Sequence, residues 1–312
     1  MPEIVLTYFE PFGNRSTNVS KEVALSFESQ FELHKLKVSW NDIEEELDSL
    51  EEPNYLFMLG EAGKYSNITI ELEAKNLANG VDNLNVSKNE EPILKDEPSS
   101  LLTNIDFSAY KGSASISHDA GKYLCNCSYY LALRKLKKAK VVFIHFPYID
   151  ENNNSLQNLC YKLREIVSYV ISRDLETNYY DFCPLEAKAI RNDIFIKEQG
   201  FAKEFDEIDA ISTHFLLKAS KTPIATCRLF FDASLNAYHL GRIAVKKEYR
   251  NLGIGTRLIE EVIHFLKTKG VHEIILGAQV KAKDFYTKNG FESFGDIHLD
   301  ESVPHVMMKK SF

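Results

Sequence analysis

The hydrophobic pattern changes along this 312-residue chain, and the change limits the folds open to it. In the first half, short apolar runs alternate with stretches whose apolar residues recur every three or four positions. In the second half, several apolar runs follow one another closely before one strongly amphipathic stretch. Alternating strands and helices indicate a largely parallel sheet, whereas adjacent strands indicate antiparallel pairing. The sequence therefore predicts two domains of different architecture.

The first domain is predicted to be an open α/β sandwich around a mostly parallel sheet. The runs IVLTYF (4–9) and NYLFMLG (54–60) are typical of buried strands, and residues 154–172 place their apolar side chains on one helical face. Residues 79–100 are polar and contain prolines, so we expect a long surface loop there. A polar stretch, RDLETNYYDFCPLEAK, then separates the two patterns, and we place the boundary after residue 174.

The second domain is predicted to be an α+β fold with a mixed sheet. It opens with a helix at LEAKAIRNDIFIKEQ and continues with the strands THFLLKAS, PIATCRLFF and AYHLGRIAV. An amphipathic helix, a further strand, a short helix and a last strand complete it. The two domains thus span residues 1–174 and 175–312, and each is long enough to bury a core of its own.

Composition argues against several classes of partner. Hydrophobic residues make up 44% of the chain and charged residues 26%, which is an ordinary globular balance. The formal net charge of −8 gives no attraction for nucleic acid or anionic lipid, so we expect neither as a partner. Five scattered cysteines, with no secretory leader and no long apolar span, indicate a reduced, cytoplasmic protein. The sequence gives no oligomeric state.

A glycine-bearing turn, RNLGIG (Arg250–Gly255), lies between a predicted strand and a predicted helix of the second domain. Glycines let backbone N–H groups approach an anion, and the start of a helix favours negative charge. The turn lacks the Gly-Lys-Ser/Thr ending of a P-loop and the third glycine of a dinucleotide-binding fingerprint. From these residues alone, a pyrophosphate cradle and a tight connection without a ligand both remain open.

The sequence around this turn resembles the GNAT (Gcn5-related N-acetyltransferase) family over residues 184–310. The turn matches the family's Arg/Gln-x-x-Gly-x-Gly/Ala motif, and the later run FYTKNGF matches as well. The segments IFIKEQGF and VPHVMM are similar to those of a small bacterial branch. The resemblance implies a GNAT fold, acetyl-CoA as cosubstrate, an amine as acetyl acceptor and no metal.

The same resemblance implies the site residues of the second domain. Backbone groups of Ile243, Ala244 and Val245 would bind the pantetheine arm. Tyr286 would protonate the departing CoA thiolate, a role that suits a phenol, although a packed helical tyrosine is the alternative. The pyrophosphate would be held by Arg250, Asn251, Leu252, Gly253, Ile254, Gly255 and Thr256. The base for the acceptor amine stays open among Glu198, Glu207 and His214.

The first domain contains the parts of a thiol nucleophile on three separate elements. Cys125 follows Gly121 at a predicted helix start, His145 ends the strand VVFIH, and Glu71 ends the strand NITIE. A thiol needs a base to accept its proton and a third group to orient that base. A core cysteine, a structural histidine and a solvated glutamate are the alternatives. Cys127 lies too close to Cys125 for a usual redox pair, and no partners stand at metal-ligand spacing.

The local sequences around these residues resemble pyroglutamyl peptidase I over residues 1–172. The matches are FEPFG, GEAGKYSNITIELEAKN, DAGKYLCN and FIHFPYI. The resemblance implies that Cys125 attacks the carbonyl of an N-terminal pyroglutamyl residue, that His145 is the base, and that Glu71 orients His145. Phe9 and Phe12 would hold the planar lactam ring between them. Cys127 is then a packing residue.

The motifs depart from that family around the ring pocket. The family's Gln-Ala-Gly-Gly-Arg is here the segment 61–65, Glu-Ala-Gly-Lys-Tyr, and its Arg-Val-Ala-Ile-Asn is the segment 72–76. The sequence therefore predicts a bifunctional enzyme, a cysteine peptidase that acts on pyroglutamyl peptides joined to an acetyl-CoA-dependent N-acetyltransferase. In the alternative, only the acetyltransferase turns over, and the first domain is a ligand-binding or recruiting module.

Overall fold

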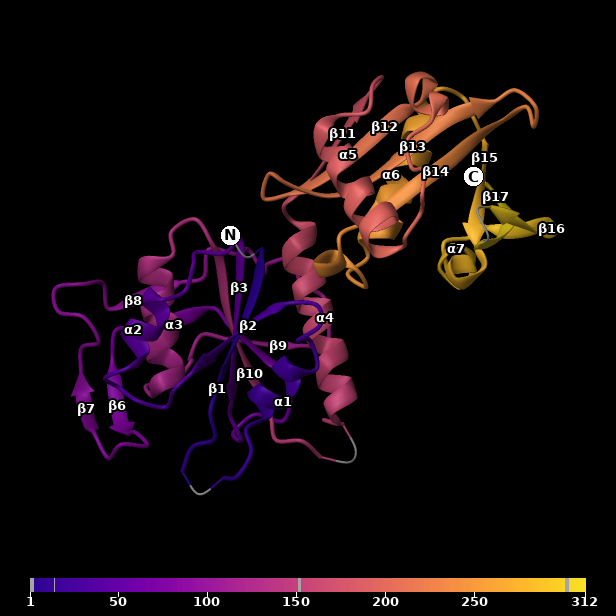
Figure 1. The fold of residues 1–312 in the computed structure, drawn as a ribbon. Coiled ribbons are helices and arrows are strands. Elements are labelled where there is room, and N and C mark those ends of the chain that lie inside the picture. Colours follow the sequence, from indigo (N-terminus) through magenta and orange to yellow (C-terminus); the bar gives the residue numbers. More distant parts are fainter. Residues whose placement is uncertain (1–2, 14, 151–152, 301–302) are drawn as a thin grey trace. The chain divides into compact units, whose positions relative to one another are not determined.

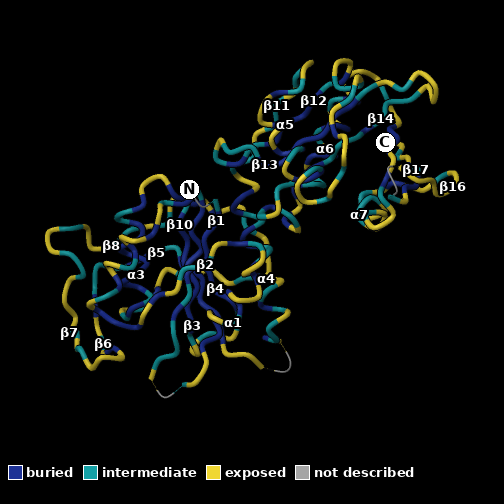
Figure 2. The backbone as a smooth tube through the Cα atoms, in the orientation of Figure 1, coloured by how far each residue is buried: buried dark blue, intermediate teal, exposed yellow. Residues whose placement is uncertain are grey.

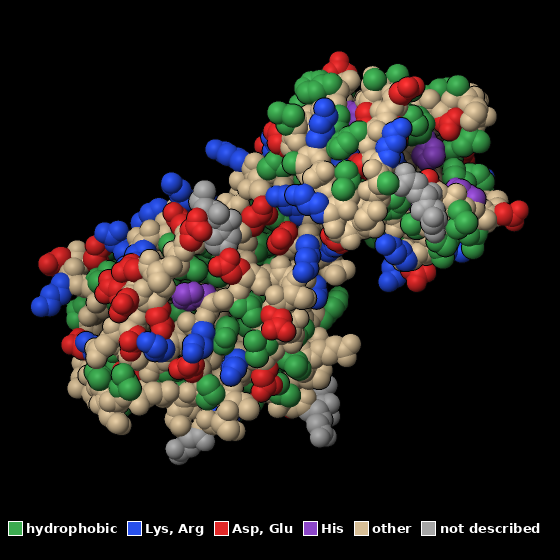
Figure 3. All heavy atoms as spheres, in the orientation of Figure 1, with side chains coloured by type: hydrophobic (Ala, Val, Ile, Leu, Met, Phe, Trp, Pro, Cys, Tyr) green, Lys and Arg blue, Asp and Glu red, His purple; other side chains and the backbone are tan. Residues whose placement is uncertain are grey.

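The computed structural model describes residues 3–13, 15–150, 153–300 and 303–312. The chain divides into two compact units, Met1–Val170 and Ile171–Phe312, each of mixed α/β architecture. This division lies four residues before the one inferred from sequence. No helix among the described residues is long and apolar enough to cross a membrane. On the face drawn in Figure 3, acidic and basic side chains are interspersed on both units.

A six-stranded sheet forms the centre of the first unit, as Figure 1 shows. Its order is β2-β1-β3-β10-β4-β9, and the neighbours among the first four strands pair in parallel. The strand bounds are β1 (Ile4–Phe9), β2 (Glu32–Leu36), β3 (Tyr55–Glu61), β4 (Thr69–Glu71), β9 (Ser115–Ser117) and β10 (Lys140–Phe146). β3 is buried at every position, because helices cover a parallel sheet on both faces (Figure 2).

Four helices cover this sheet: α1 (Val19–Leu25), α2 (Ile43–Asp48), α3 (Leu124–Lys135) and α4 (Leu156–Ser172). Figure 1 shows α2 and α3 on one face and α1 and α4 on the other. The apolar positions of α4 predicted from sequence, among them Leu163 and Val167, are buried, except Leu156 at its first residue, which is half-buried. α3 begins shortly after Gly121, so Cys125 falls in its first turn, as predicted.

The expected loop at residues 79–100 is wrong in part. β6 (Ala78–Val81) and β7 (Ser87–Glu91) pair as a hairpin, and β8 (Ser100–Leu102) pairs with β5 (Glu73–Lys75). These strands are short, mostly exposed and rich in polar residues. They give no hydrophobic periodicity, which is why the sequence pattern missed them.

A seven-stranded mixed sheet forms the second unit, in the order β11-β12-β13-β14-β15-β17-β16. Its strands are β11 (Leu175–Tyr180), β12 (Thr213–Ala219), β13 (Thr222–Asp232), β14 (Ala237–Val245), β15 (Glu273–Gln279), β16 (Glu292–Asp300) and β17 (Val303–Ser311). All neighbours pair antiparallel except β14 and β15, which pair in parallel. The polar stretch expected to separate the domains contains β11, a strand of this sheet.

The helical segments of the second unit pack on its strands, with α5 (Leu185–Arg191) in front of them and α6 (Ile254–Thr268) behind them in Figure 1. A π-helical segment, η1 (Asn192–Glu198), continues α5, and α7 (Lys283–Lys288) follows β15. Three 3-10 turns complete the unit: η2 (Glu207–Ile211), η3 (Lys247–Tyr249) and η4 (Val280–Ala282).

β14 and β15 separate shortly after they meet. Their register holds one pair, His239 with Ile275, and the later residues of β14 pair only with β13 on the other side. The backbone of β14 up to Val245 therefore presents an edge toward the space where β15 has moved away.

Candidate active sites

A cavity of about 220 Å³ opens in the first unit around the start of α3 and the ends of β1, β3 and β10. It brings together four of the residues expected from sequence: Phe9, Phe12, Cys125 and His145. The remaining lining residues are Asn18, Val38, Glu61, Ala62, Lys64, Ala120, Gly121, Lys122, Tyr123 and Leu124. Sites of open α/β sheets collect at strand ends in this way, because the carboxyl ends of parallel strands meet at one edge.

Cys125 owes its place to two glycines. Gly121 has a φ of +87°, which a residue with a side chain rarely adopts, and it leads the chain into α3. A Cβ on Gly60 would lie 3.0 Å from the sulfur of Cys125 and 2.7 Å from the ring of Phe143. Burial, followed by the charge of Glu71, raises the pKa of the Cys125 thiol to about 12. The thiol therefore stays protonated at neutral pH until a base accepts its proton.

His145 is oriented by Glu71. Nδ1 of His145 lies 2.7 Å from Oε1 of Glu71, and a carboxylate can only accept, so Nδ1 carries the hydrogen. Nε2 is then the nitrogen able to take up a proton on the cavity side. Glu71 is fully buried, which raises its pKa, but the hydrogen bond and the charge interaction with His145, together with the hydrogen bond from Tyr65, outweigh burial and leave the pKa below its usual value. Glu71 therefore remains charged next to His145.

Tyr65 contacts the same carboxylate. Its hydroxyl donates to Oε1 of Glu71 at 2.8 Å and lies 3.2 Å from the hydroxyl of Ser117. Sequence reasoning marked Tyr65 only as a departure from a family motif and did not place it next to Glu71. The alternation of residues along a strand gives no sign of this contact, because the loop after β3 folds back over β4.

The wall of the cavity that faces away from His145 is apolar. Phe9 is buried, Phe12 is partly buried, and the rings of Phe12 and Tyr123 lie 6.4 Å apart at 50°. Tyr123 was not expected from sequence. Because Tyr123 donates its hydroxyl to the carbonyl of Val81, the β6–β7 hairpin that the sequence pattern missed supports this wall.

Glu61, another departure from the family motif, is a buried member of the cavity lining. Its carboxylate lies 2.8 Å from Nε of Arg15 and accepts the backbone N–H of Val19 at 2.8 Å. The change from an amide to a carboxylate therefore comes with a cationic partner. Cys127, by contrast, lies in the hydrophobic core and does not line the cavity.

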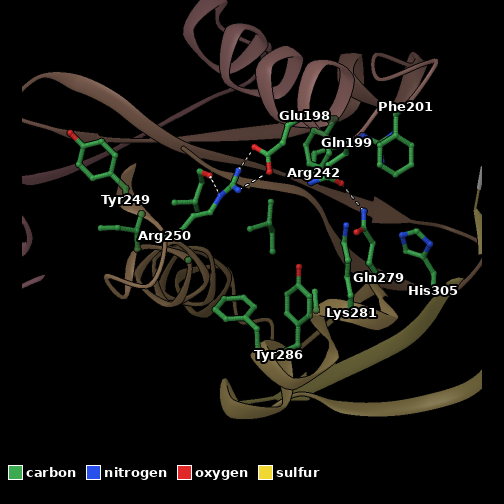
Figure 4. A pocket seen from close by; sticks show the side chains of 18 of the residues that line it. Glu198, Gln199, Phe201, Arg242, Tyr249, Arg250, Gln279, Lys281, Tyr286 and His305 are labelled. Atoms are coloured by element: carbon green, nitrogen blue, oxygen red, sulfur yellow. Dashed lines mark hydrogen bonds and ion pairs between the residues drawn. The ribbon is translucent and has the colours of Figure 1, made fainter. Parts of the chain in front are cut away.

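A cavity of about 840 Å³ lies in the second unit where β14 and β15 separate, and Figure 4 shows it closely. Eight of the ten residues expected to bind acetyl-CoA line it: Ile243, Val245, Arg250, Asn251, Gly253, Ile254, Gly255 and Thr256. The side chains of Ala244 and Leu252, also expected, are buried instead. Apart from these two residues, the residues expected to bind acetyl-CoA lie along the edge of β14 and the turn into α6.

The turn before α6 is shaped to present backbone to this cavity. Gly253 caps the helix with a φ of +77°, and Asn251 has a φ of +61°. The first N–H groups of a helix have no acceptor within it and favour an anion. A Cβ on Gly255 would lie 2.9 Å from the ring of Phe285, so only glycine leaves that approach open. The free edge of β14, this helix start and the cavity volume together fit acetyl-CoA.

The side chain of Arg250 is bound to other residues of the protein at the cavity wall. Its guanidinium forms two hydrogen bonds of 2.7 and 2.6 Å with the carboxylate of Glu198, drawn as dashed lines in Figure 4, and its Nε donates to the carbonyl of Val245 at 3.0 Å. Glu198 was one of the candidate bases. With its pKa lowered chiefly by hydrogen bonds from Arg250, it is held as the partner of an arginine.

The two other candidate bases lie away from the cavity. Glu207 is exposed on η2, and neither it nor His214 is among the lining residues. His214 is fully buried, with Nε2 2.9 Å from the carbonyl of Asp209, and burial lowers its pKa. A carbonyl only accepts, so Nε2 of His214 donates there. These two expectations are therefore not supported by the position of the side chains.

His305 lines the cavity and was not proposed from sequence, although it lies in the quoted run VPHVMM. Its Nδ1 lies 2.9 Å from the carbonyl of Val303, so Nδ1 carries the hydrogen and Nε2 keeps a lone pair. His305 lies on β17 and pairs in register with Gln279 of the neighbouring strand β15. The side chain of Gln279 donates a hydrogen bond to Gln199 at 3.1 Å. Figure 4 shows His305 next to Gln279 at the cavity wall.

Tyr286 lies on α7 and directs its hydroxyl into the cavity in Figure 4. Its ring packs between Phe285 and Phe291, with centroid distances of 5.0 and 5.9 Å. Burial raises the pKa of Tyr286, so its hydroxyl stays protonated throughout the range in which the protein would work.

Charged residues at the other end of the cavity form a connected network. Arg242, a lining residue with a φ of +52°, pairs with Glu204 at 3.0 Å, and Glu204 in turn accepts from the buried Arg191 at 2.7 Å. The network continues through Asp209, which also accepts from Arg228. Three arginines and the acidic groups between them thus fix the backbone of β14 where it turns toward the cavity. No group of residues suited to hold a metal ion occurs in the described part of the chain.

Two family profiles match the chain. The profile described as "Pyroglutamyl peptidase" matches residues 2–168, and the one described as "Acetyltransferase (GNAT) domain" matches residues 181–312. The pyrrolidone-carboxylate peptidase of Thermococcus onnurineus is 31% identical over 170 residues, which cover 48% of this chain and 85% of that protein. A Bacillus subtilis protein named "Putative acetyltransferase" is 30% identical over 126 residues, which cover 39% of this chain and 84% of that protein.

Among solved structures, pyrrolidone carboxyl peptidase from Thermus thermophilus is 26% identical, with a TM-score of 0.47, over 51% of this chain and 96% of that one. The segments that the two family profiles match correspond to the two units described above, so the family of each unit is established separately. The chain belongs to the pyroglutamyl peptidase family through its first unit and to the GNAT acetyltransferase family through its second.

Proposed function

We propose that this protein is a bifunctional enzyme whose first unit removes N-terminal pyroglutamate from peptides and whose second unit transfers an acetyl group from acetyl-CoA to an amine. One observation carries the first activity. Cys125 and His145 line one cavity with Phe9 and Phe12, and Glu71 fixes the tautomer of His145 from behind. This arrangement supplies a nucleophile, a base, an orienting group and an aromatic wall.

In the proposed peptidase reaction, the sulfur of Cys125 forms a bond to the carbonyl carbon of the pyroglutamyl residue, and its proton passes to Nε2 of His145. N–H groups at the start of α3 stabilise the negative oxygen of the intermediate. His145 then gives the proton to the departing amine as the carbon–nitrogen bond breaks. Water attacks the resulting thioester, gives a proton to His145 and releases pyroglutamate, and the thiol is restored.

The raised pKa of the Cys125 thiol suits this order of events. A thiol that keeps its proton at neutral pH gains nucleophilicity only as His145 accepts that proton, so attack and proton transfer take place together. Glu71, which stays charged, stabilises the imidazolium that forms.

A pyroglutamyl fluorogenic amide tests this activity. We expect release of the fluorophore by the unmodified protein and none by Cys125→Ala. Cys127→Ala is the matched control, because this neighbouring thiol is buried in the core, and we expect it to retain activity. Absence of release by the unmodified protein, in a preparation that binds acetyl-CoA, would exclude pyroglutamyl amides as substrates.

Acetyl-CoA, when bound to the second unit, supplies an activated thioester. The N–H groups between Arg250 and Thr256 would hold its pyrophosphate, and the free edge of β14 at Ile243–Val245 would hydrogen-bond its amide groups. Tyr286 would donate a proton to the thiolate as it leaves. His305 would accept the proton of the acceptor amine at Nε2, because it is the histidine on this cavity whose Nε2 keeps a lone pair.

Calorimetric titration with acetyl-CoA tests the cradle. Gly253→Ala and Gly270→Ala form a matched pair, since both glycines have positive φ values, +77° and +72°, and Gly253 is the N-cap of α6 while Gly270 directly follows its C-cap, Lys269. Both variants carry the same backbone strain, but only Gly253 faces the cavity. We expect weaker binding for Gly253→Ala alone. Equal affinities for the two variants would refute this placement of the pyrophosphate.

A second candidate function for the first unit rests on its altered pocket. Glu61 and Tyr65 replace the glutamine and arginine of the family motif, so the unit would bind a pyroglutamyl or similar ligand without cleaving it. Binding of pyroglutamate by the unmodified protein, together with no release from the fluorogenic amide, would favour this reading. In either case we propose a reduced, cytoplasmic setting, in which all five thiols stay free.

A further inference from the structure

Glu71 receives a hydrogen bond from a side chain that the mechanism above does not use. The hydroxyl of Tyr65 donates to Oε1 of Glu71 at 2.8 Å, and the same oxygen accepts Nδ1–H of His145 at 2.7 Å. The rings of Tyr65 and His145 lie 5.8 Å apart. Two donors thus share one carboxylate oxygen. The three residues come from different segments: Tyr65 follows β3, Glu71 ends β4 and His145 lies on β10.

The hydroxyl of Tyr65 is held in this position by further contacts. The hydroxyl of Ser117 lies 3.2 Å away and the carbonyl of Asp119 lies 3.4 Å away, while the ammonium group of Lys64 lies 4.7 Å from the centre of the Tyr65 ring. Because the bond to Glu71 is the shortest of these and ends on a charge, it takes the single phenolic hydrogen. Ser117 can then donate to the oxygen of Tyr65.

This contact is a departure of the chain from the family motif, in which the corresponding segment ends in arginine. A phenol supplies one neutral donor, whereas a guanidinium supplies five donors and a positive charge. At Tyr65 the chain therefore stabilises the carboxylate of Glu71 by a neutral hydrogen-bond donor and places no positive charge there.

We propose that Tyr65 is a positioning residue of the peptidase site, which shares Oε1 of Glu71 with His145 and thereby sets how strongly Glu71 holds the imidazole. This inference rests on the peptidase function proposed above. A hydrogen bond from Tyr65 draws electron density from Oε1, so Glu71 pulls less strongly on Nδ1–H of His145 than it would alone.

The variant Tyr65→Phe removes this hydroxyl and keeps the ring. We expect kcat for a pyroglutamyl fluorogenic amide to fall about tenfold, the effect of losing one hydrogen bond to a charged group. We also expect the acid limb of the pH profile to move upward, because Glu71, no longer shared with a phenol, stabilises the imidazolium form of the site more strongly. KM should change little, since Tyr65 does not line the cavity. Tyr148→Phe is the matched control, because it also loses a phenol hydroxyl close to the loop of Gly63 without contacting Glu71.

Proton NMR gives a readout that needs no substrate. The hydrogen between Nδ1 of His145 and Oε1 of Glu71 should give a low-field resonance, which moves further downfield in Tyr65→Phe because Oε1 is no longer shared. If Tyr65→Phe does not fold, 3-fluorotyrosine placed at position 65 is a stronger donor and should move the resonance in the opposite direction.

The outcomes separate this inference from the peptidase proposal. If the unmodified protein releases no fluorophore, the peptidase proposal fails, and the NMR shifts still test the role of Tyr65. If the resonance moves as expected and the acid limb moves with it, Tyr65 positions the Glu71–His145 pair. If kcat falls without a shift of either the acid limb or the resonance, Tyr65 is a structural residue only and the inference is overturned.

Discussion

The two units build their candidate sites from different parts of the chain. In the first unit, the site consists of side chains, Cys125, His145 and Glu71, that the start of α3 and the neighbouring strands β10 and β4 bring together. In the second unit, most of the site is backbone, offered where β14 and β15 separate and where α6 begins. A side-chain site depends on the identity of single atoms, whereas a backbone site depends on shape and conformation. Substitutions should therefore damage the two sites in different ways.

The difference also appears in the role of glycine. In the first unit, Gly60 makes room for a side chain, because a Cβ there would lie 3.0 Å from the sulfur of Cys125. In the second unit, Gly253 and Gly255 make room for a ligand and allow the backbone itself to face the cavity. The same residue type thus supports a nucleophile in one unit and a binding surface in the other.

The largest expected effect is that of Glu71→Gln on the first site. An amide at this position can hold the wrong tautomer of His145 and does not stabilise an imidazolium, so we expect peptidase activity to fall by about 10³- to 10⁴-fold. Glu73→Gln, two residues further along, serves as the control, since it changes a half-buried glutamate that does not contact His145. The measurement is release from the pyroglutamyl amide. A loss below tenfold in Glu71→Gln would mean that the first site does not depend on this side chain.

His305→Gln tests whether the second site also requires a single side chain. We expect transfer to primary amines to fall about 100-fold at neutral pH, the usual contribution of a general base. The deficit should shrink as the pH rises, because the amine then loses its proton to solvent. Release of the CoA thiol with a set of amines, such as spermidine, glycinamide and benzylamine, measures it.

His298→Gln is the control for this test, because His298 is an exposed neighbour whose ring lies 6.2 Å from that of His305. Equal rates for His305→Gln and the unmodified protein with every amine that is acetylated would remove His305 from the mechanism. The second site would then be built from backbone and Tyr286 alone.

The sequence predicted those site residues that stand in local motifs better than those that are defined by contacts with distant segments. Cys125, His145 and the glycines before α6 stand in local motifs, so their positions could be inferred before the fold was known. Tyr65 contacts Glu71 from another segment, and no local pattern marks that contact, whereas His305 stands in the quoted run VPHVMM, which gives no sign that its side chain lines the cavity. Glu207 and His214 were candidate bases only because they are titratable, and the structure gives them positions outside the cavity.

The same limit applies to the fold. Buried strands such as β3, and helices with one apolar face such as α4, were predicted because their periodicity is strong. β11 and the β6–β7 hairpin were missed because these strands are short and polar. They form strands because they pair with neighbouring strands, and the sequence pattern does not show this pairing. The missed hairpin matters for function, since it holds Tyr123 at the wall of the first cavity.

Gly255→Val tests the backbone site by shape. An added Cβ at this position would already lie 2.9 Å from the ring of Phe285. The larger side chain of valine would collide with that ring and would occupy the space through which a ligand reaches the start of α6. We expect the affinity for acetyl-CoA to fall by about 10- to 100-fold, as overpacking costs in well-packed sites. In Gly241→Val, the control, an added Cβ meets Arg228 only at 3.8 Å. Calorimetric titration of both variants checks the expectation, and equal affinities would count against a backbone cradle at Gly255.

The smallest expected effect is that of Tyr286→Phe. Burial raises the pKa of this phenol, so it stays protonated and able to donate across the working range, and activity should show no alkaline loss from its own ionisation. Without the hydroxyl, the CoA thiolate must leave unprotonated, which we expect to slow transfer about tenfold at neutral pH. The deficit should vanish above the pKa of a thiol, about 8.5, where the free thiolate is stable without a donor. Tyr238→Phe, which removes a hydroxyl outside the cavity, is the control. A deficit that persists unchanged at high pH would mean that Tyr286 only packs between Phe285 and Phe291. The second site would then have no side chain that acts on the leaving group, in contrast to the first site, where His145 does so.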